Sequence, residues 1–324
     1  MNHENRKLGK EGPMLSPIGI GCWQFSRGAN AVGRYWDDVE SEDMQAIVRS
    51  SLAGGINWFD TAEVYGNGAS ERALADALDQ EETGLDEVYI ADKWWPGGRT
   101  SRSIEKTIAA RRDALNQRPI ALYQIHQPFS FSSVRKEMEA MLALKRRGEI
   151  GEIGVSNFTE KRMLEAYKTL HAEGVPLASN QIKYSLLDRK AEINGLFDTC
   201  RELGISIIAY SPLEQGLLTG KYHQDPEAIK KKRGPRKWMG RFRRGYLEKT
   251  GPLMKLLEET AAKYEATVSQ VVLSWMIQYH GDLVFAIPGA SSEKHAIEHA
   301  GALSVRLTDD EAEQISNASW DVQL

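Results

Sequence analysis

The sequence contains little cysteine and no long hydrophobic run. Only Cys22 and Cys200 occur among its 324 residues, and they form no C-x-x-C pair, which argues against a disulfide framework and a structural zinc site. No segment reaches the roughly 18 consecutive apolar residues that a membrane-spanning helix needs, and the polar residues after Met1 do not form a signal peptide. We therefore expect a soluble cytoplasmic protein that binds no metal and no membrane.

The sequence also lacks a strong excess of charge of either sign. Its 41 Lys and Arg residues are nearly balanced by 45 Asp and Glu residues, which gives a formal net charge of -4. Such a balance provides no overall attraction to nucleic acid or to an anionic membrane surface. The length of 324 residues suits either one large barrel or two ordinary domains. Because no linker, repeat or low-complexity tract interrupts the chain, we predict a single domain over residues 1–324.

Short apolar segments alternate with amphipathic segments almost from end to end. The apolar segments, which predict strands, are residues 18–22, 56–59, 88–93, 120–126, 150–156, 178–184, 205–210 and 283–288. The amphipathic segments, which predict helices, are residues 41–53, 70–78, 101–115, 132–147, 159–171, 191–203, 252–264, 268–278, 292–301 and 308–319. Strands buried on both faces show no polar alternation, and a series of them separated by helices is typical of a closed parallel barrel.

An open, doubly wound α/β sheet is the alternative fold. It would normally carry a glycine-rich fingerprint after the first strand, but segment 19–24 lacks the third glycine and no helix follows it directly. Segment 216–221 resembles a phosphate-binding P-loop, but it is one residue short and continues with Tyr222 instead of Ser or Thr. We therefore predict an α/β fold, a (β/α)8 TIM barrel with an N-terminal β-hairpin within residues 7–21 and two extra C-terminal or peripheral helices.

Polar side chains follow several of the predicted strands. Asp60 and Tyr65 follow the strand at 56–59, Lys93 ends the next strand, and His126 ends the one after that. In a TIM barrel the loops after the strands meet at one mouth, where active sites lie. A lysine held by a carboxylate favours the ionised form of a nearby phenol, so we expect a lowered pKa for Tyr65 and a role as proton donor. Taken alone, residues of these types more often serve as turn, cap or packing residues.

A second group of polar residues follows the later strands. Ser156, Asn157 and Gln181 offer hydrogen-bond donors and acceptors for a carboxamide. Tyr210 offers a flat face for an aromatic ring, and His126 is placed to polarise a substrate carbonyl. A proton-donating phenol, a carbonyl-polarising group and a seat for an amide-bearing ring indicate hydride transfer from a nicotinamide.

Several motifs resemble those of the aldo-keto reductase family, in register from about residue 7 to residue 298. They are Gly55-Ile56-Asn57, Phe59-Asp60-Thr61-Ala62, Tyr65-Gly66, Lys93, Leu122-Tyr123-Gln124-Ile125-His126, Gly154-Val155-Ser156-Asn157-Phe158, Asn180-Gln181, Ala209-Tyr210-Ser211-Pro212-Leu213, Gly216-Leu217-Leu218-Thr219-Gly220-Lys221 and Ile287-Pro288-Gly289-Ala290. The resemblance implies a catalytic tetrad, with Tyr65 as the general acid in reduction. Its members are Asp60, Tyr65, Lys93 and His126.

The same resemblance implies an NAD(P)H-dependent oxidoreductase that reduces aldehydes and ketones to alcohols and, in reverse, oxidises alcohols or sugars. It places Ser156, Asn157, Gln181 and Tyr210 on the nicotinamide, and Ser211, Leu213 and Lys221 near the pyrophosphate. The other residues that we predict to line the cofactor site are Gly21, Cys22, Trp23, Asp60, Gly216, Gly289, Ser291, Lys294, His295, Glu298 and His299.

The choice of cofactor depends on the residues after the last strand. A 2′-phosphate requires charge-assisted donors, and Ser291, Lys294 and His295 are the evident local ones. The alternative is that Ser292 and Glu293 simply begin a helix whose N-terminal amides bind phosphate. We predict NADPH, with NADH as the less favoured cofactor.

Residues 221–251 form a predicted long basic loop. Residues 221–249 hold eleven Lys or Arg residues against Asp225, Glu227 and Glu248. This segment follows the seventh strand, where the family resemblance implies a loop that folds over the dinucleotide, so we expect cofactor binding to order it. Two alternatives remain, a basic patch for nucleic acid and a solvated loop whose charge aids solubility.

Tryptophans on the loops after the strands are candidates for the wall of a substrate pocket. They are Trp23, Trp36, Trp94 and Trp95. We favour Trp94 because it follows Lys93 directly. The predicted pocket for a small carbonyl substrate is lined by Trp23, Tyr65, Trp94 and His126.

Two other classes of protein compete with the enzyme. A regulatory or channel-associated subunit on the same fold ranks second, and a nucleic-acid-binding protein that uses the basic segment ranks third. The oligomeric state is left open by the sequence.

Overall fold

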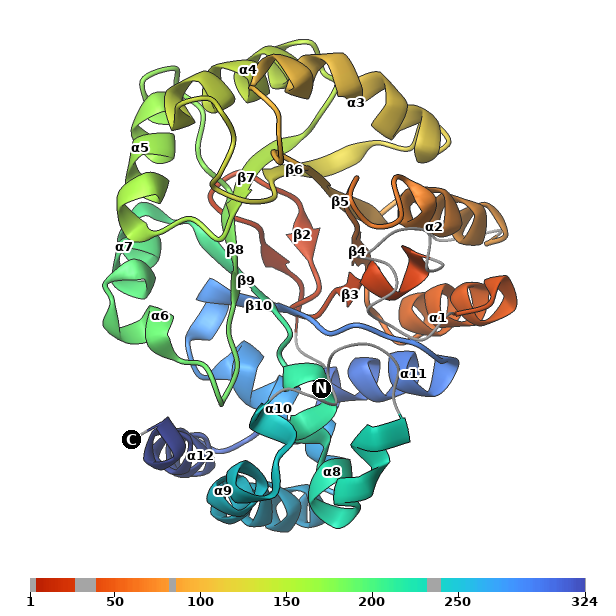
Figure 1. The fold of residues 1–324 in the computed structure, drawn as a ribbon, viewed down its shortest axis with the longest axis vertical. Helices are drawn as coiled ribbons and strands as arrows, with labels where there is room; N and C mark the ends of the chain where they lie inside the picture. Colours follow the sequence, from red (N-terminus) through yellow and green to blue (C-terminus); the bar gives the residue numbers. More distant parts are fainter. Residues whose placement is uncertain (1–3, 27–38, 82–85, 232–239, 324) are drawn as a thin grey trace.

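Eight parallel strands pair in chain order, from β3 to β10 (Figure 1). The computed structural model describes residues 4–26, 39–81, 86–231 and 240–323. The strands are β3 (Ile20–Gly21), β4 (Trp58–Asp60), β5 (Tyr89–Trp94), β6 (Ile120–Ile125), β7 (Glu152–Ser156), β8 (Ser179–Lys183), β9 (Ser206–Tyr210) and β10 (Val284–Ile287). Parallel bridges from Ile18 to Ala286 and from Gly21 to Gly289 join the first strand to the last. The sheet is therefore a nearly closed barrel, as predicted.

Helices cover the outer face of this sheet (Figure 1). They are α1 (Ser41–Ala53), α2 (Ala69–Asp79), α3 (Arg102–Ala114), α4 (Val134–Arg146), α5 (Glu160–His171), α7 (Leu196–Leu203), α10 (Val268–Gln278) and α11 (Glu293–Gly301). Polar residues cap the N-terminal ends of several helices. Thr267 and Gln270 form a capping box at α10, and Ser133 caps α4. Every helix within the described ranges is too short or too polar to cross a membrane.

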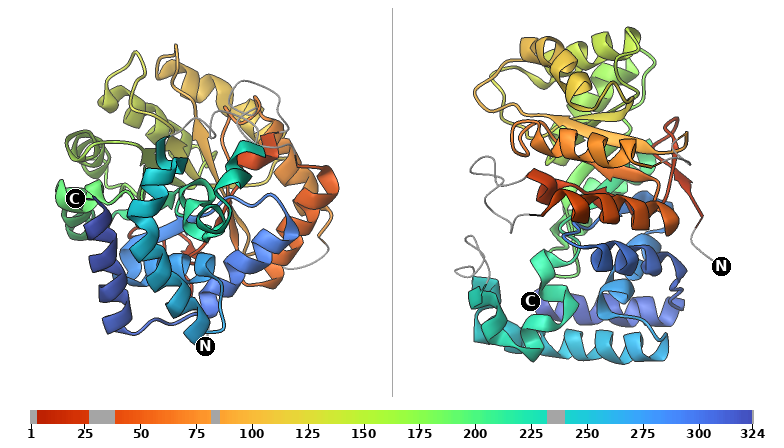
Figure 2. Two further views of the ribbon diagram at one scale, coloured as in Figure 1. Left: turned by 60° about the horizontal axis from the view of Figure 1, so that its bottom comes forward. Right: turned by 90° about the vertical axis from the view of Figure 1, so that its right-hand side faces the viewer.

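The predicted N-terminal hairpin is present and closes one end of the barrel. It consists of β1 (Arg6–Lys7) and β2 (Met14–Leu15), which pair antiparallel. Leu15 packs inside the barrel with Trp58 and Phe285, and Arg6 donates to the backbone oxygen of Ile277 at 2.7 Å. In the side view of Figure 2 the hairpin lies at one end of the barrel, and α8 (Lys221–Gln224) lies towards the other.

The two predicted extra helices are α9 (Arg244–Lys263) and α12 (Asp309–Gln323), which pack against each other. The predicted start of α9 at residue 252 is wrong, because the helix begins at Arg244 and Pro252 lies inside it. Proline normally favours the first turn of a helix. Here a buried face that includes Leu247 and Leu253 continues across the proline, and this packing outweighs its local preference.

The predicted helix at 191–203 is divided into two. Residues Lys190–Ile193 form α6, and α7 begins only at Leu196. Gly195, between them, has φ of 87°, a left-handed conformation that favours glycine and interrupts a helix. The apolar periodicity alone did not reveal this break.

Candidate active site

Six strands bring polar side chains to one end of the barrel. These are Asp60 at the end of β4, Lys93 in β5, His126 directly after β6, Ser156 at the end of β7, Gln181 in β8 and Tyr210 at the end of β9. Because parallel neighbouring strands end at the same edge, the six side chains converge there. Tyr65 reaches the same place from the loop after β4.

Lys93 and Asp60 form a buried ion pair. Lys93 Nζ donates to Asp60 Oδ1 and, at 2.8 Å, to the backbone oxygen of Thr61. Asp60 Oδ2 accepts hydrogen bonds from Nε2 of Gln181 at 2.8 Å and from Nε2 of Gln124 at 3.2 Å. Burial alone would lower the pKa of Lys93, but the contacts with Asp60 together with the charges of Tyr65 and Asp92 outweigh burial and raise that pKa, so the ammonium stays charged.

Tyr65 lies against this ion pair. Lys93 Nζ is 5.2 Å from the centroid of the phenol ring, close enough for its charge to lower the pKa of the hydroxyl. Desolvation raises the pKa of Tyr65, the Lys93 cation lowers it and the Asp60 carboxylate raises it, and the balance lies above the ordinary value. The expected lowering is therefore wrong, because burial outweighs the cation. The phenol keeps its proton at neutral pH, which suits a proton donor.

His126 is held neutral beside the phenol. Burial and the nearby Lys93 cation lower its pKa well below the ordinary value. Its ring packs edge-to-face on Tyr65 with 5.6 Å between centroids, and on Trp95 with 5.3 Å. Nδ1 of His126 is buried and has no hydrogen-bond partner among the described residues. A neutral imidazole in this position can offer an N–H to a substrate oxygen.

The residues predicted to hold a carboxamide and its ring lie together. Asn157 Oδ1 accepts a hydrogen bond from the Tyr210 hydroxyl at 2.9 Å, and Asn157 Nδ2 donates to Ser156 Oγ at 3.1 Å. Asn157 has φ of 59°, a conformation that asparagine tolerates better than most residues and that points the chain into the next helix. Gln181 lines the same cavity, but its amide nitrogen is already bonded to Asp60.

The turn after β9 brings Ser211, Leu213 and Gly216 to the cavity wall, and Lys221 follows at the start of α8. Its backbone is unusual, because Ser211 and Gln215 have φ of 55° and 58°. Such conformations occur where a structure requires a particular backbone path, often next to a ligand.

Glu214 anchors this turn from beneath. Its buried carboxylate accepts a hydrogen bond from Ser185 Oγ at 2.9 Å and pairs with Lys183 at 2.6 Å and with Arg241. Arg241 belongs to the predicted basic loop, so an ion pair ties that segment to the cavity wall.

The far end of the cavity is formed by the segment after β10. The residues predicted there all line it: Gly289, Ser291, Lys294, His295, Glu298 and His299. Ser292 caps α11 by accepting a hydrogen bond from the backbone N–H of His295. Burial lowers the pKa of His299 to about 4, so its ring is neutral at physiological pH.

One continuous cavity of about 730 Å³ connects these groups. It is lined by every predicted cofactor residue, whereas Lys93 lies behind Tyr65 and is completely buried. Its volume is within the usual range for sites of small molecules and cofactors. The lining residues that the sequence analysis did not place in the site are Gln24, Val64, Gln127, Pro212, Gln215, Thr219, Thr267, Ser269, Ile287 and Pro288.

The prediction that Trp94 lines the substrate pocket is wrong. Its side chain is fully buried, and its Nε1 donates to Ser103 Oγ in α3 at 3.1 Å. Trp95 lines the cavity instead and packs edge-to-face on Phe129. Side chains alternate along a strand, so an inward-facing Lys93 places Trp94 outside and Trp95 inside. This period of two was the available signal. Trp36 lies outside the described residues.

The described part of residues 221–251 is helical and packed. It contains α8, short 3-10 turns at Pro226–Lys231 and Gly240–Phe242, and the start of α9. Tyr222, Ile229, Phe242 and Leu247 form a small apolar cluster there. The prediction of a long loop is therefore wrong for these residues, because their apolar side chains bury one another. Residues 232–239 lie outside the described residues, and ordering by a cofactor stays a prediction.

A family model described as the aldo/keto reductase family matches residues 17–319. The chain belongs to the aldo/keto reductase family. A chloroplastic pyridoxal reductase of Arabidopsis thaliana is 34% identical over 96% of this chain and 85% of that protein. An uncharacterized oxidoreductase of Mycobacterium tuberculosis is 36% identical over 94% of this chain and 90% of that protein.

Solved aldo/keto reductase structures share the fold. The glycerol dehydrogenase of Gluconobacter oxydans superposes with a TM-score of 0.81 at 25% identity, covering 98% of this chain and 94% of that chain. The predicted family, barrel and class of oxidoreductase acting on aldehydes and ketones are thus confirmed.

Proposed function

We propose that the protein reduces aldehydes and ketones to alcohols with NADPH, and that Tyr65 donates the proton. The observation that carries this proposal is the chain Asp60–Lys93–Tyr65 beside His126, at one end of a single cavity that extends to His299. NADPH supplies the hydride when it is bound. Residues 1–324 would form one catalytic domain, and the buried thiols of Cys22 and Cys200 are consistent with work in the reducing cytoplasm.

The protein's own residues hold and move the proton. Tyr65 keeps it until negative charge develops on the substrate oxygen, and Lys93 then stabilises the phenolate that remains. Asp60 keeps the ammonium charged and in place. His126 is neutral, so it positions the carbonyl by hydrogen bonding without competing as an acid.

The lining of the cavity fits a dinucleotide. Asn157 and Ser156 offer the groups that bind a carboxamide, and the ring of Tyr210 lies beside them. Lys221 lines the wall further along, where a pyrophosphate needs a cation. Lys294 and Ser291, at the start of α11, favour the 2′-phosphate of NADPH over the hydroxyl of NADH.

Aromatic side chains favour a planar substrate. Trp23 stacks on Tyr65 with 5.9 Å between centroids at an angle of 14°, and Trp95 lines the same cavity and packs on His126. Flat rings bind well between such walls. Because a relative is named pyridoxal reductase, we propose aromatic aldehydes, pyridoxal among them, as substrates.

The test is the oxidation of NADPH and of NADH, measured side by side with pyridoxal and a simple aromatic aldehyde. We expect faster turnover with NADPH and loss of turnover in Tyr65→Phe, whose ring is retained. Equal rates in the variant would reject Tyr65 as the acid. Tight NADPH binding without turnover of any carbonyl would instead favour a regulatory subunit.

A further inference from the structure

A second set of titratable side chains is buried on the outer face of β5, immediately before Lys93. Asp92 points away from the barrel interior and meets Glu71 of α2 and Arg111 of α3, with Tyr123 of β6 alongside. Glu71, Asp92 and Tyr123 are 0% exposed and Arg111 is 8% exposed. None of them lines the cavity, so the proposed reaction does not use them directly.

Hydrogen bonds from the described residues leave two carboxyl oxygens of this cluster without a donor. Arg111 Nη1 donates to Glu71 Oε2 at 3.0 Å, and the backbone N–H of Lys93 donates to Asp92 Oδ1 at 2.8 Å. The remaining oxygens, Glu71 Oε1 and Asp92 Oδ2, are buried and receive no N–H or O–H donor from the described residues. The two carboxyl groups lie next to each other, and each affects the pKa of the other. Adjacent buried carboxyl groups that receive no other donor at these oxygens can bond to each other only if one of them carries a proton.

We propose that Glu71 and Asp92 share one proton and that this protonated pair is a positioning element, which holds β5 so that Lys93 stays against Asp60 and Tyr65. The inference of a shared proton rests only on the contacts within the cluster. Its role in catalysis also rests on the function proposed above. Asp92 acts on the reaction through the backbone of Lys93, its neighbour on the strand. Glu71 and Arg111 act through Asp92, from the two helices that cover this strand.

The charge balance explains why the proton stays. With the proton in place, the cluster holds one carboxylate and the Arg111 guanidinium. Without the proton, two carboxylates would lie next to each other in the water-free space between β5 and α2. Burial first, and then the charge of Asp92, raise the pKa of Glu71 to about 10, although Arg111 opposes them. The other charged groups that face the cluster are Lys93 and Glu63, and Glu63 is itself paired with Arg99.

Glu71→Gln replaces the protonated carboxyl group by a neutral amide of nearly the same shape. Its amide nitrogen can donate to Asp92 Oδ2 while its oxygen accepts from Arg111, so the contact with Arg111 is kept and the side chain at this position no longer titrates. We measure the free energy of unfolding in urea at several pH values for both proteins. Because the pKa of Glu71 is raised in the folded state, its stabilising effect is present below the unfolded pKa and lost as the pH rises towards 10. The wild-type folding constant should fall about tenfold per pH unit relative to Glu71→Gln between pH 6 and 9.

Glu71→Leu tests the positioning role, because it removes the proton and leaves Asp92 and Arg111 without their partner. We expect kcat to fall at least about tenfold at pH 7 while the dissociation constant of NADPH changes less than about threefold. Glu71→Gln should restore kcat to within about twofold of wild type. The titration of Tyr65, read from tyrosinate absorbance against a Tyr65→Phe background, should move to higher pH in Glu71→Leu as Lys93 withdraws. This readout requires no turnover.

Tyr123→Phe is the matched control, because it removes the neighbouring buried hydroxyl, which also has no partner among the described residues. It should leave the pH dependence of stability unchanged. Parallel pH dependence in wild type and Glu71→Gln would overturn the shared proton. A Tyr65 titration and kcat in Glu71→Leu equal to those of wild type would overturn the positioning role. If the Leu variant does not fold, the Gln comparison still decides the first point. A wild-type protein that reduces no carbonyl would refute the proposed function and leave both titrations readable.

Discussion

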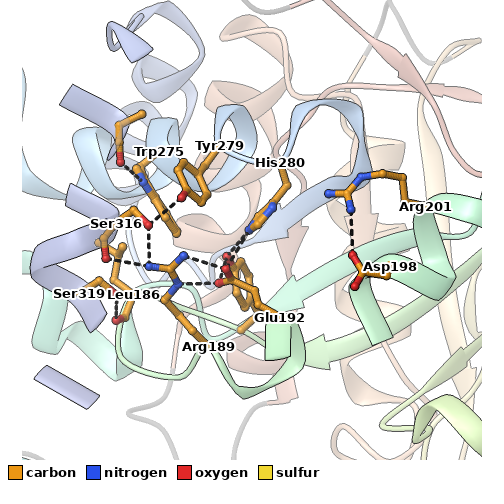
Figure 3. A network of polar contacts seen from close by, with 12 residues as sticks. Leu186, Arg189, Glu192, Asp198, Arg201, Trp275, Tyr279, His280, Ser316 and Ser319 are labelled. Carbon is orange, nitrogen blue, oxygen red and sulfur yellow. Dashed lines mark hydrogen bonds and ion pairs between the residues drawn. The ribbon is translucent and has the colours of Figure 1, made fainter. Parts of the chain in front are cut away.

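Two buried ion pairs in this barrel use similar chemistry for different ends. The first is Lys93 with Asp60 at the mouth; the second is Arg189 with Glu192, after β8 (Figure 3). Arg189 Nη2 donates to Glu192 at 2.7 Å, and its Nη1 donates to the backbone oxygen of Ser316 in α12 at 2.8 Å. The guanidinium also lies over the ring of Trp320, 4.4 Å from its centroid.

The difference lies in what else each cation touches. The polar contacts of Arg189 end on Glu192 and on the neutral backbone oxygen and hydroxyl of Ser316. Burial raises the pKa of Glu192, but the contacts with Arg189 and the hydrogen bond from His280 outweigh burial and lower it to about 2, so this carboxylate stays ionised. That pair fastens α12 to the barrel. Lys93 also touches Tyr65, whose proton faces a cavity large enough for a substrate. A buried ion pair therefore becomes part of an active site when one of its neighbours can exchange a proton with a ligand.

The largest effect is expected for Tyr65→Phe, which removes the exchangeable proton and keeps both ion pairs. The kcat for carbonyl reduction should fall by about 10²–10⁴-fold, the usual contribution of a general acid. The dissociation constant of NADPH, measured by quenching of protein fluorescence, should change little. In the wild type, reduction should persist well above neutral pH, because the raised pKa of Tyr65 keeps the phenol protonated. A decline beginning near neutrality would contradict this assignment.

The converse change is Arg189→Met, which breaks the structural pair alone. Loss of one partner of a buried pair costs about 3 kcal/mol, because the other charge remains buried. Urea unfolding should register this loss, whereas kcat at a temperature where the variant is folded should stay within about threefold of wild type. If kcat fell as far as in Tyr65→Phe, the separation between the two pairs would be wrong.

Trp94, the last residue of β5, and Trp95, which follows it, allow the same separation of a structural role from a role in the site. Trp94→Ala should destabilise the fold by about 3–5 kcal/mol, because it empties a fully buried site against α3. Trp95→Ala should cost less stability and raise KM for aromatic aldehydes several-fold, because it removes a cavity wall. Thermal unfolding and steady-state kinetics of both variants measure the two effects. Equal behaviour of the two variants would refute the assignment of inner and outer faces.

The smallest effect is expected for Arg241→Met, which releases the basic segment from Glu214. Because Lys183 still pairs with that carboxylate, no buried charge is left alone. NADPH should dissociate a few times faster than from the wild type, which corresponds to a loss of about 1 kcal/mol of binding free energy. Stopped-flow displacement of the cofactor measures this rate. A rate equal to wild type would show that the ion pair does not restrain the cofactor.

The fold followed from local patterns because each strand and helix carries its own signal. The apolar periods were sufficient to place most of the elements, and the structure adds the capping residues Ser133 and Thr267 at two of the helix starts. Boundaries failed where tertiary packing prevailed, as at Pro252, whose helix is held by residues buried on both sides of it.

The residues that meet in the site could largely be predicted from the sequence, whereas their pKa shifts could not. Parallel strands must end at one edge, so Asp60, Lys93 and His126 could be brought together from sequence order alone. The direction of the pKa shift at Tyr65 could not be predicted from the sequence, because it depends on how far burial outweighs the Lys93 cation. The Glu71 and Asp92 pair also escaped notice, because a charged residue on a helix usually faces solvent and only packing shows otherwise.

The most direct test of the account is an alkaline titration of Tyr65 in wild type and in Lys93→Met, read as tyrosinate absorbance with Tyr65→Phe subtracted. Lys93 lowers the pKa of the phenol against the effect of burial, so we predict that Tyr65 titrates at a distinctly higher pH in the variant. A Tyr65 titration at the same or lower pH without Lys93 would contradict the claim that this ion pair controls the catalytic proton.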